Sequence, residues 1–98
     1  MAYLVTCTFD LKNASRQDYL SAYADLEKIG LKKVMVSDQG GNVVIPTTTV
    51  AGIFTGSSAA SVRDDILVSI KKAFGARRFS SEIFVTAGGD WAWGGATT

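Results

Sequence analysis

One acidic residue, Asp10, stands at the end of an apolar, β-branched segment near the N-terminus. A carboxylate at the end of a central strand can hold a hard cation such as Mg²⁺, and a two-fold axis would bring a second copy of it alongside. The other interpretation is that Asp10 caps the following turn through Lys12 and Asn13, as aspartate commonly does. Residue type and position leave both interpretations open.

The composition removes several other kinds of active site. The chain has no histidine, which excludes histidine triads, histidine-ligated metals and an imidazole pH switch. Its one cysteine, Cys7, can form neither an internal disulfide nor a thiolate zinc site. The position of Cys7 on the core-facing side of a strand predicts a small buried hydrophobe.

Basic residues form short clusters rather than one long run. Lys12 with Arg16, and Arg77 with Arg78, are candidates for contacts to nucleic-acid phosphates, and Phe79 offers a face on which a base could stack. A solvated surface of ordinary basic side chains is the competing interpretation. The net charge of +1 argues against a protein that blankets nucleic acid with positive charge.

The hydrophobic pattern predicts an alternation of strands and helices. Period-two patterns predict strands, and apolar residues at spacings of three and four predict helices. Ser15 with Asp18 forms a helix N-cap, and Gly30 and Gly75 are expected to end the two helices. Pro46 assigns its segment to an edge, a bulge or a hairpin arm. The expected strands are 2–9, 31–37, 48–55 and 81–86, with an extended segment at 43–46, and the expected helices are 16–29 and 59–74.

This order predicts a single α+β domain over 1–98 with the ferredoxin-like βαββαβ arrangement. Two helices should cover one face of a four-stranded antiparallel sheet, with the strands at 2–9 and 48–55 in its centre. Residues 94–98 are expected to fray.

Because both helices cover one face, the other face of the sheet is left open. Thr6 and Thr8 lie on it, and an open face of this kind is either a ligand platform or a subunit interface. Trp91 and Trp93 alternate with Ala92, which suits a short fifth strand that adds to a partner's sheet. They could equally fold back and plug the open face of their own chain. Thr6, Thr8, Trp91 and Trp93 are therefore the candidate homodimer interface.

The segment from Tyr3 to Leu11, with its Phe9-Asp10 pair, resembles the first strand of the CRISPR-associated endoribonuclease family that partners the integrase. It is similar also to the virulence-associated protein D toxins and to their SinR-like relatives, which tend to end in a segment like Gly89-Asp90-Trp91. The resemblance covers nearly the whole chain in size and element order. It implies a ferredoxin-like homodimer in which two strand-end aspartates face each other, with Asp10 in the place of the metal-binding aspartate. Family members with nuclease activity cut RNA or DNA with magnesium.

The resulting hypothesis is a small dimeric nuclease-like protein, with Asp10 as catalytic metal ligand and Lys12, Arg16, Arg77 and Arg78 on phosphates. The alternative is a non-enzymatic interaction or regulatory dimer that uses the open sheet face and binds a protein partner. The biological pathway is left open, and a defence system, a toxin–antitoxin pair and a mobile-element cassette all fit the sequence. The N-terminal segment lacks the basic region of a signal peptide, and no apolar run suits a membrane span, so we expect a cytoplasmic protein.

Overall fold

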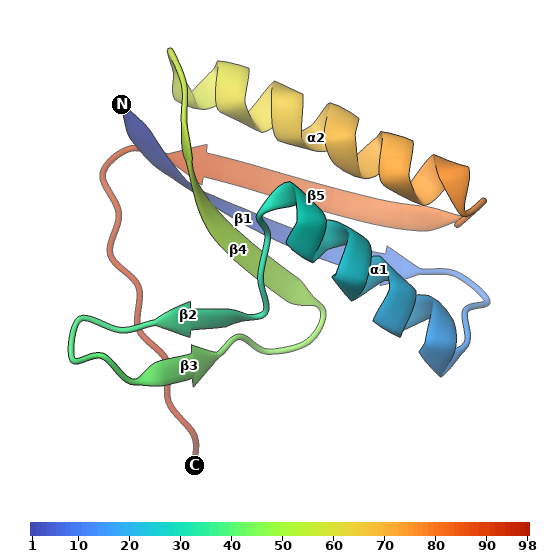
Figure 1. The fold of residues 1–98 in the computed structure, drawn as a ribbon, viewed down its shortest axis with the longest axis horizontal. Helices are drawn as coiled ribbons and strands as arrows, with labels where there is room; N and C mark the ends of the chain where they lie inside the picture. Colours follow the sequence, from blue (N-terminus) through green and yellow to red (C-terminus); the bar gives the residue numbers. More distant parts are fainter.

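The computed structural model describes all of residues 1–98, as a small α+β fold with two helices and two antiparallel sheets (Figure 1). The elements are β1 (Ala2–Leu11), α1 (Arg16–Ile29), β2 (Val34–Val36), β3 (Asn42–Val44), β4 (Thr49–Thr55), α2 (Ala59–Ala76) and β5 (Ser81–Gly88). The larger sheet has three strands in the order β4-β1-β5, and the smaller is a hairpin of β2 and β3. The element order is consistent with the predicted βαββαβ arrangement, except that three strands and not two lie between the helices.

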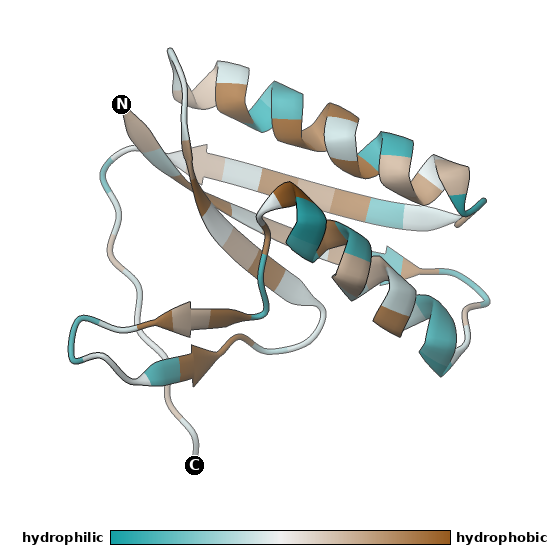
Figure 2. Cartoon of the chain, viewed as in Figure 1, coloured by the Kyte–Doolittle hydropathy of each residue, from teal (hydrophilic) through white to brown (hydrophobic).

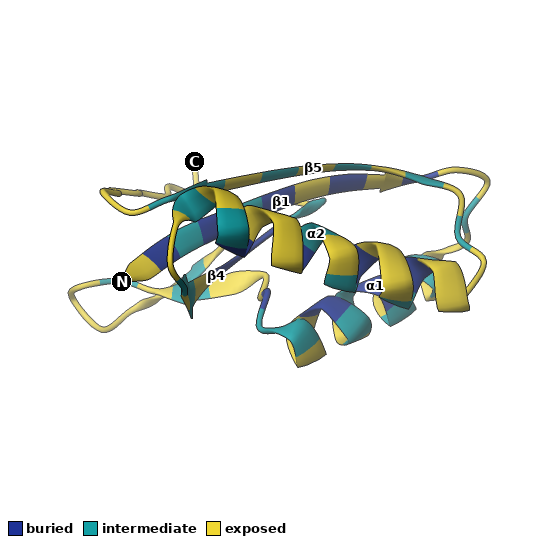
Figure 3. Cartoon of the chain, turned by 90° about the horizontal axis from the view of Figure 1, so that it is seen from above, coloured by how far each residue is buried: buried dark blue, intermediate teal, exposed yellow.

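Strand β1 is the centre of the core, as its alternating pattern predicts. It pairs with β4 on one side and β5 on the other, and both helices cover the same face of the sheet (Figure 3). The odd-numbered side chains of β1 are buried against the helices, whereas Thr8 and Asp10 are exposed on the other face. The main buried partners from the helices are Ala22, Leu26, Val62, Ile66, Ile70 and Phe74.

The start and end of α1 follow the sequence signals. Ser15 and Asp18 form a reciprocal capping box, in which each side-chain oxygen accepts the other's backbone N–H at 3.1 and 3.0 Å. Gly30 ends the helix with φ 111°, a left-handed conformation that favours glycine, and its N–H donates to the carbonyls of Leu26 and Glu27. These contacts fix where the chain leaves β1 and re-enters the core.

Helix α2 ends later than Gly75, contrary to the sequence-based expectation. It continues to Ala76, and Arg78 takes the left-handed conformation with φ 60°. The N–H groups of Arg78 and Phe79 donate to the carbonyls of Gly75 and Phe74 at 3.0 Å, and the rings of Phe74 and Phe79 pack edge to face. This is a Schellman end, in which the hydrophobic contact between the two rings sets where the helix stops.

The predicted four-stranded sheet is not formed, because the second strand leaves it almost at once. Lys32 alone pairs with Ala51 of β4, through two backbone hydrogen bonds of 2.8 and 2.9 Å. The chain then turns away, Lys33 accepts the N–H of Ile45, and β2 continues the pairing with β3. Pro46 has no N–H for a ladder and separates β3 from β4. Strand β4 is consequently an edge of the three-stranded sheet and not a central strand.

The hairpin and the C-terminal tail lie together on one side of the molecule (Figure 1). Strand β2 is apolar along its length (Figure 2), and Met35 is half-buried. The tail after β5 contains no strand, so the additional strand predicted around Trp91 and Trp93 is not formed. A bilayer-crossing helix is also absent, since neither helix combines the necessary length and hydrophobicity.

Candidate functional site

Asp10 lies exposed near the end of β1, where a tyrosine of α1 holds its carboxylate. The Tyr19 hydroxyl lies 3.0 Å from Asp10 Oδ1 and 3.1 Å from the Leu11 carbonyl, and it accepts the Leu11 N–H at 3.0 Å. Tyr19 is itself placed by packing against Phe9 in the core, with 6.1 Å between ring centroids. Asp10 makes no hydrogen bond to Lys12 or Asn13, so the turn-capping role is not what the structure shows.

A second carboxylate, that of Glu82, stands beside Asp10 across the sheet. The two residues are paired between β1 and β5, which sets their Cβ atoms ~5 Å apart on one face. Lys12 Nζ lies 3.1 Å from Glu82 Oε1, and both side chains are largely exposed. The ammonium group offsets the repulsion that two neighbouring carboxylates would otherwise suffer.

The donor set suits a hard cation but does not enclose one. No group of three or more histidine, cysteine, aspartate or glutamate side chains gathers as a metal cluster. Two carboxylates match Mg²⁺, which keeps several waters and completes its shell with substrate phosphate oxygens. Asp10 and Glu82 are therefore the residues that would hold it, and sharing of one cation by two copies of Asp10 stays a prediction.

The predicted phosphate-binding residues all lie at the same end of the domain. The end of β1, the start of α1, the end of α2 and the start of β5 meet there (Figure 1). Arg16 and Arg78 are exposed and form no ion pair. Lys12 is paired with Glu82, and Arg77 is paired with Asp25. Arg16 and Arg78 are therefore the two of the four cations that can bind a phosphate without breaking an ion pair.

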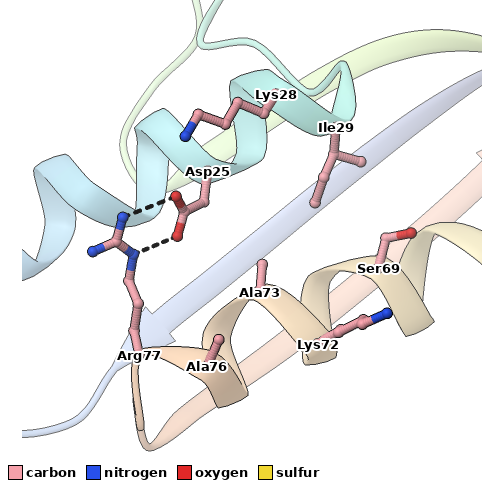
Figure 4. A pocket seen from close by; sticks show the side chains of 8 residues that line it. All are labelled: Asp25, Lys28, Ile29, Ser69, Lys72, Ala73, Ala76 and Arg77. Atoms are coloured by element: carbon pink, nitrogen blue, oxygen red, sulfur yellow. Dashed lines mark hydrogen bonds and ion pairs between the residues drawn. The ribbon is translucent and has the colours of Figure 1, made fainter.

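Arg77 is held on the helix side by Asp25 of α1. Its Nη2 donates to Asp25 Oδ1 at 3.0 Å and its Nε to Oδ2, a two-pronged ion pair between α1 and the end of α2 (Figure 4). The hydrogen bond from Arg77 holds the pKa of Asp25 below its ordinary value. The pair closes one end of an open groove of about 510 Å³ between the helices, with Lys28 and Lys72 also on its walls.

Phe79, the predicted stacking residue, is half-buried against Phe74 and packed on the core. Its ring packs against Phe74 and so stabilises the C-terminal end of α2. A base-stacking role would require the ring to leave that contact.

The predicted interface residues occupy two different environments. Thr8 is exposed on the open face, whereas Thr6 is half-buried. Thr6 and Trp93 line the same apolar cavity of about 170 Å³, which lies between the sheet and the hairpin. Trp91 and Trp93 are 36% and 38% exposed, and both line a second hollow beside the hairpin. This matches a tail that folds back on its own chain.

Two features of this end were missed by sequence reasoning, namely Tyr19 and Glu82. The helical spacing places the ring of Tyr19 on the apolar face of α1, as the structure has it, but the spacing says nothing of its hydroxyl. Glu82 could have been found by aligning the two predicted strands so that their alternating faces matched.

No protein-family model matches the chain, and no curated protein matches its sequence.

Proposed function

We propose that the protein is a small metal-dependent ribonuclease-like protein that acts on nucleic acid at the end of the domain bearing Asp10. The observation that carries the proposal is the carboxylate pair: Asp10, oriented by Tyr19, beside Glu82 on the neighbouring strand. The resemblance of the Phe9-Asp10 strand end to the CRISPR-associated and virulence-associated families supports the same assignment.

Each nearby side chain has a defined task in this proposal. Asp10 and Glu82 bind the cation, and Tyr19 keeps the Asp10 carboxylate in one orientation. Bound Mg²⁺ would stabilise charge on the phosphodiester and lower the pKa of a bound water. If Glu82 held the cation, Lys12 would be released from its 3.1 Å ion pair and would be available to a phosphate. Arg16 and Arg78 bind flanking phosphates.

Cleavage of a single-stranded RNA in Mg²⁺ or Mn²⁺ tests the proposal. Asp10→Asn keeps the size of the side chain and an oxygen for Tyr19 but removes the charge. We expect it to lower the cleavage rate by ~100-fold or more, because the metal supplies several kcal/mol of transition-state stabilisation. Asp65→Asn, at an exposed position of α2, is the matched control and should leave the rate unchanged. Equal rates for wild type and Asp10→Asn would refute the assignment.

Tyr19→Phe separates orientation from metal binding. It keeps the ring against Phe9 and removes the hydrogen bond to Asp10. Loss of a partner that orients a metal ligand typically costs ~10- to 100-fold in metal affinity or activity. We expect the cleavage rate to fall by a factor in that range and high Mn²⁺ to restore part of it. Adding Tyr19→Phe to Asp10→Asn should lower the rate no further.

A non-enzymatic interaction dimer is the second candidate, and one observation favours it. The open face carries exposed apolar side chains on both outer strands, with Ile53 55% and Phe84 66% exposed. Such side chains are typical of a surface that a partner covers. Under this candidate no nuclease activity is found, and Trp91→Ala weakens self-association or capture of a protein partner.

A further inference from the structure

The outer edge of β5 carries unpaired backbone hydrogen-bonding groups. The Lys12 N–H donates to Ser80 O at 2.8 Å, which fixes the alternation along the β1–β5 ladder. Even-numbered residues of β5 therefore bond to β1, and odd-numbered ones point their N–H and C=O groups away from it. No hydrogen bond of the structure uses those outward groups. They belong to Ser81, Ile83, Val85 and Ala87.

No further strand pairs with this edge, and it lacks the residues that usually prevent strand pairing. The main contacts of β5 are with β1 and α2, and it forms the outer margin of the sheet (Figure 3). The strand is eight residues long, without proline, lysine or arginine, and Glu82 is its one charge. Edge strands normally carry such residues to prevent pairing with another chain. A long regular edge without them is suited to strand addition.

We propose that a second copy of the chain pairs with this edge, β5 against β5, in antiparallel orientation. A two-fold axis at Phe84 sets Phe84 opposite the same residue of the copy. Ile83 then faces Val85, and Ser81 faces Ala87, in hydrogen-bonded pairs that use every outward N–H and C=O. The two three-stranded sheets become one continuous sheet.

The side chains of β5 favour this register over the one centred on Glu82. Phe84 is 66% exposed in the single chain, and its own copy would cover it at a non-hydrogen-bonded pair, where cross-strand side chains come closest. Glu82 falls opposite Thr86 of the copy. A shift of the axis to Glu82 would instead set two like charges face to face, which is destabilising.

This pairing keeps the two carboxylate sites apart. Two copies of Asp10 would be separated by three strand spacings sideways and four residues along the strands, roughly 20 Å. The edge-paired dimer thus has two separate sites rather than one shared cation. The proposal does not rest on the nuclease assignment, since it concerns self-association in the absence of metal and RNA.

Disulfide trapping tests the geometry. We expect Phe84→Cys to form a covalent dimer under mild oxidation at least ~10-fold faster than Ile53→Cys, another largely exposed position, on β4 at the opposite side of the sheet. Thr8→Cys serves as the second comparison, because Thr8 is the β1 partner of Phe84 and its two copies would be ~14 Å apart, beyond disulfide reach. Faster trapping at Thr8→Cys would show that the open faces meet, and it would overturn the proposal.

The mass of the protein in solution gives an independent test that needs no cysteine. Phe84→Lys should raise the dimer dissociation constant at least ~10-fold, since it removes an aromatic pair and sets two ammonium groups opposite each other. Ile53→Lys, on the same face but in β4 at the opposite side of the sheet from β5, should leave it unchanged. A wild-type protein that is monomeric by light scattering at ~100 µM, or equal effects of both variants, would overturn the proposal. Neither result would bear on metal-dependent cleavage.

Discussion

Gly52 of β4 lies against the end of α1 so closely that a single methyl group should disrupt the fold. A Cβ atom at Gly52 would lie 2.2 Å from the carbonyl oxygen of Gly30 and 3.0 Å from the ring of Phe54. Cβ atoms essentially never lie within 3.0 Å of a non-bonded heavy atom. In Gly52→Ala, β4 and the end of α1 must therefore move apart by most of an ångström.

The loss of stability in Gly52→Ala follows from the contacts and hydrogen bonds that this movement disturbs. Overpacking of a close contact costs ~1–3 kcal/mol. The same movement pulls on the two backbone hydrogen bonds between Lys32 and Ala51, each worth ~1 kcal/mol. We expect the free energy of unfolding to fall by ~2–4 kcal/mol. For a domain of this size that lowers Tm by ~10 °C or more.

Gly75→Ala is a control in which the same substitution should change the free energy of unfolding in the opposite direction. Gly75 lies in the last turn of α2, and a Cβ there would meet no atom within 4 Å. Gly75→Ala should raise the free energy of unfolding by up to ~1 kcal/mol, because alanine is the better helix former. Urea unfolding followed by circular dichroism measures both. A Gly52→Ala protein within ~0.5 kcal/mol of wild type would refute the close approach of β4 to α1.

Three further predictions concern polar groups away from the carboxylate pair. The Tyr23 hydroxyl is buried without a hydrogen-bond partner, so Tyr23→Phe should keep or raise the free energy of unfolding, by up to ~1 kcal/mol; a clear loss in urea unfolding would reveal a hidden partner. The hydrogen bond from Arg77 lowers the pKa of Asp25 from 3.8, so their ion pair stabilises the fold above pH 3.8 and is lost as the pH falls through the lower folded-state pKa. Arg77→Ala should therefore make the free energy of unfolding less dependent on pH in the acid range. The same pH profile in wild type and variant would count against this role of the ion pair. Burial raises the pKa of Cys7 to about 11, so the native thiol should resist iodoacetamide at pH 8 and react once the chain is unfolded in urea; rapid alkylation of the folded protein would contradict its burial.

Local signals in the sequence predict the elements that form the core. The alternation along β1 identifies its buried face, because one side of a central strand must be apolar while the other meets solvent. Ser15 with Asp18, and Gly30, mark the ends of α1 correctly, because capping depends only on nearby backbone groups.

The features that sequence reasoning missed depend on contacts between distant residues. The departure of β2 from the sheet follows from pairing with β3, which local propensity does not distinguish from pairing with β4. Arg77 was expected on a phosphate, yet its geometry brings it to Asp25, 52 residues earlier in the chain. The hydrogen bond between Tyr19 and Asp10 depends on how α1 packs across β1, and no spacing in the sequence encodes that packing.

The central claim is that Asp10 and Glu82 of one chain hold a divalent cation. Titration with Mn²⁺, read as paramagnetic broadening of backbone amide signals in NMR spectra, locates such a cation directly. We predict broadening that begins at the end of β1 and the start of β5, that is lost in Asp10→Asn and that persists in Asp65→Asn. Broadening centred on Asp64 and Asp65, or a pattern unchanged by Asp10→Asn, would contradict the claim.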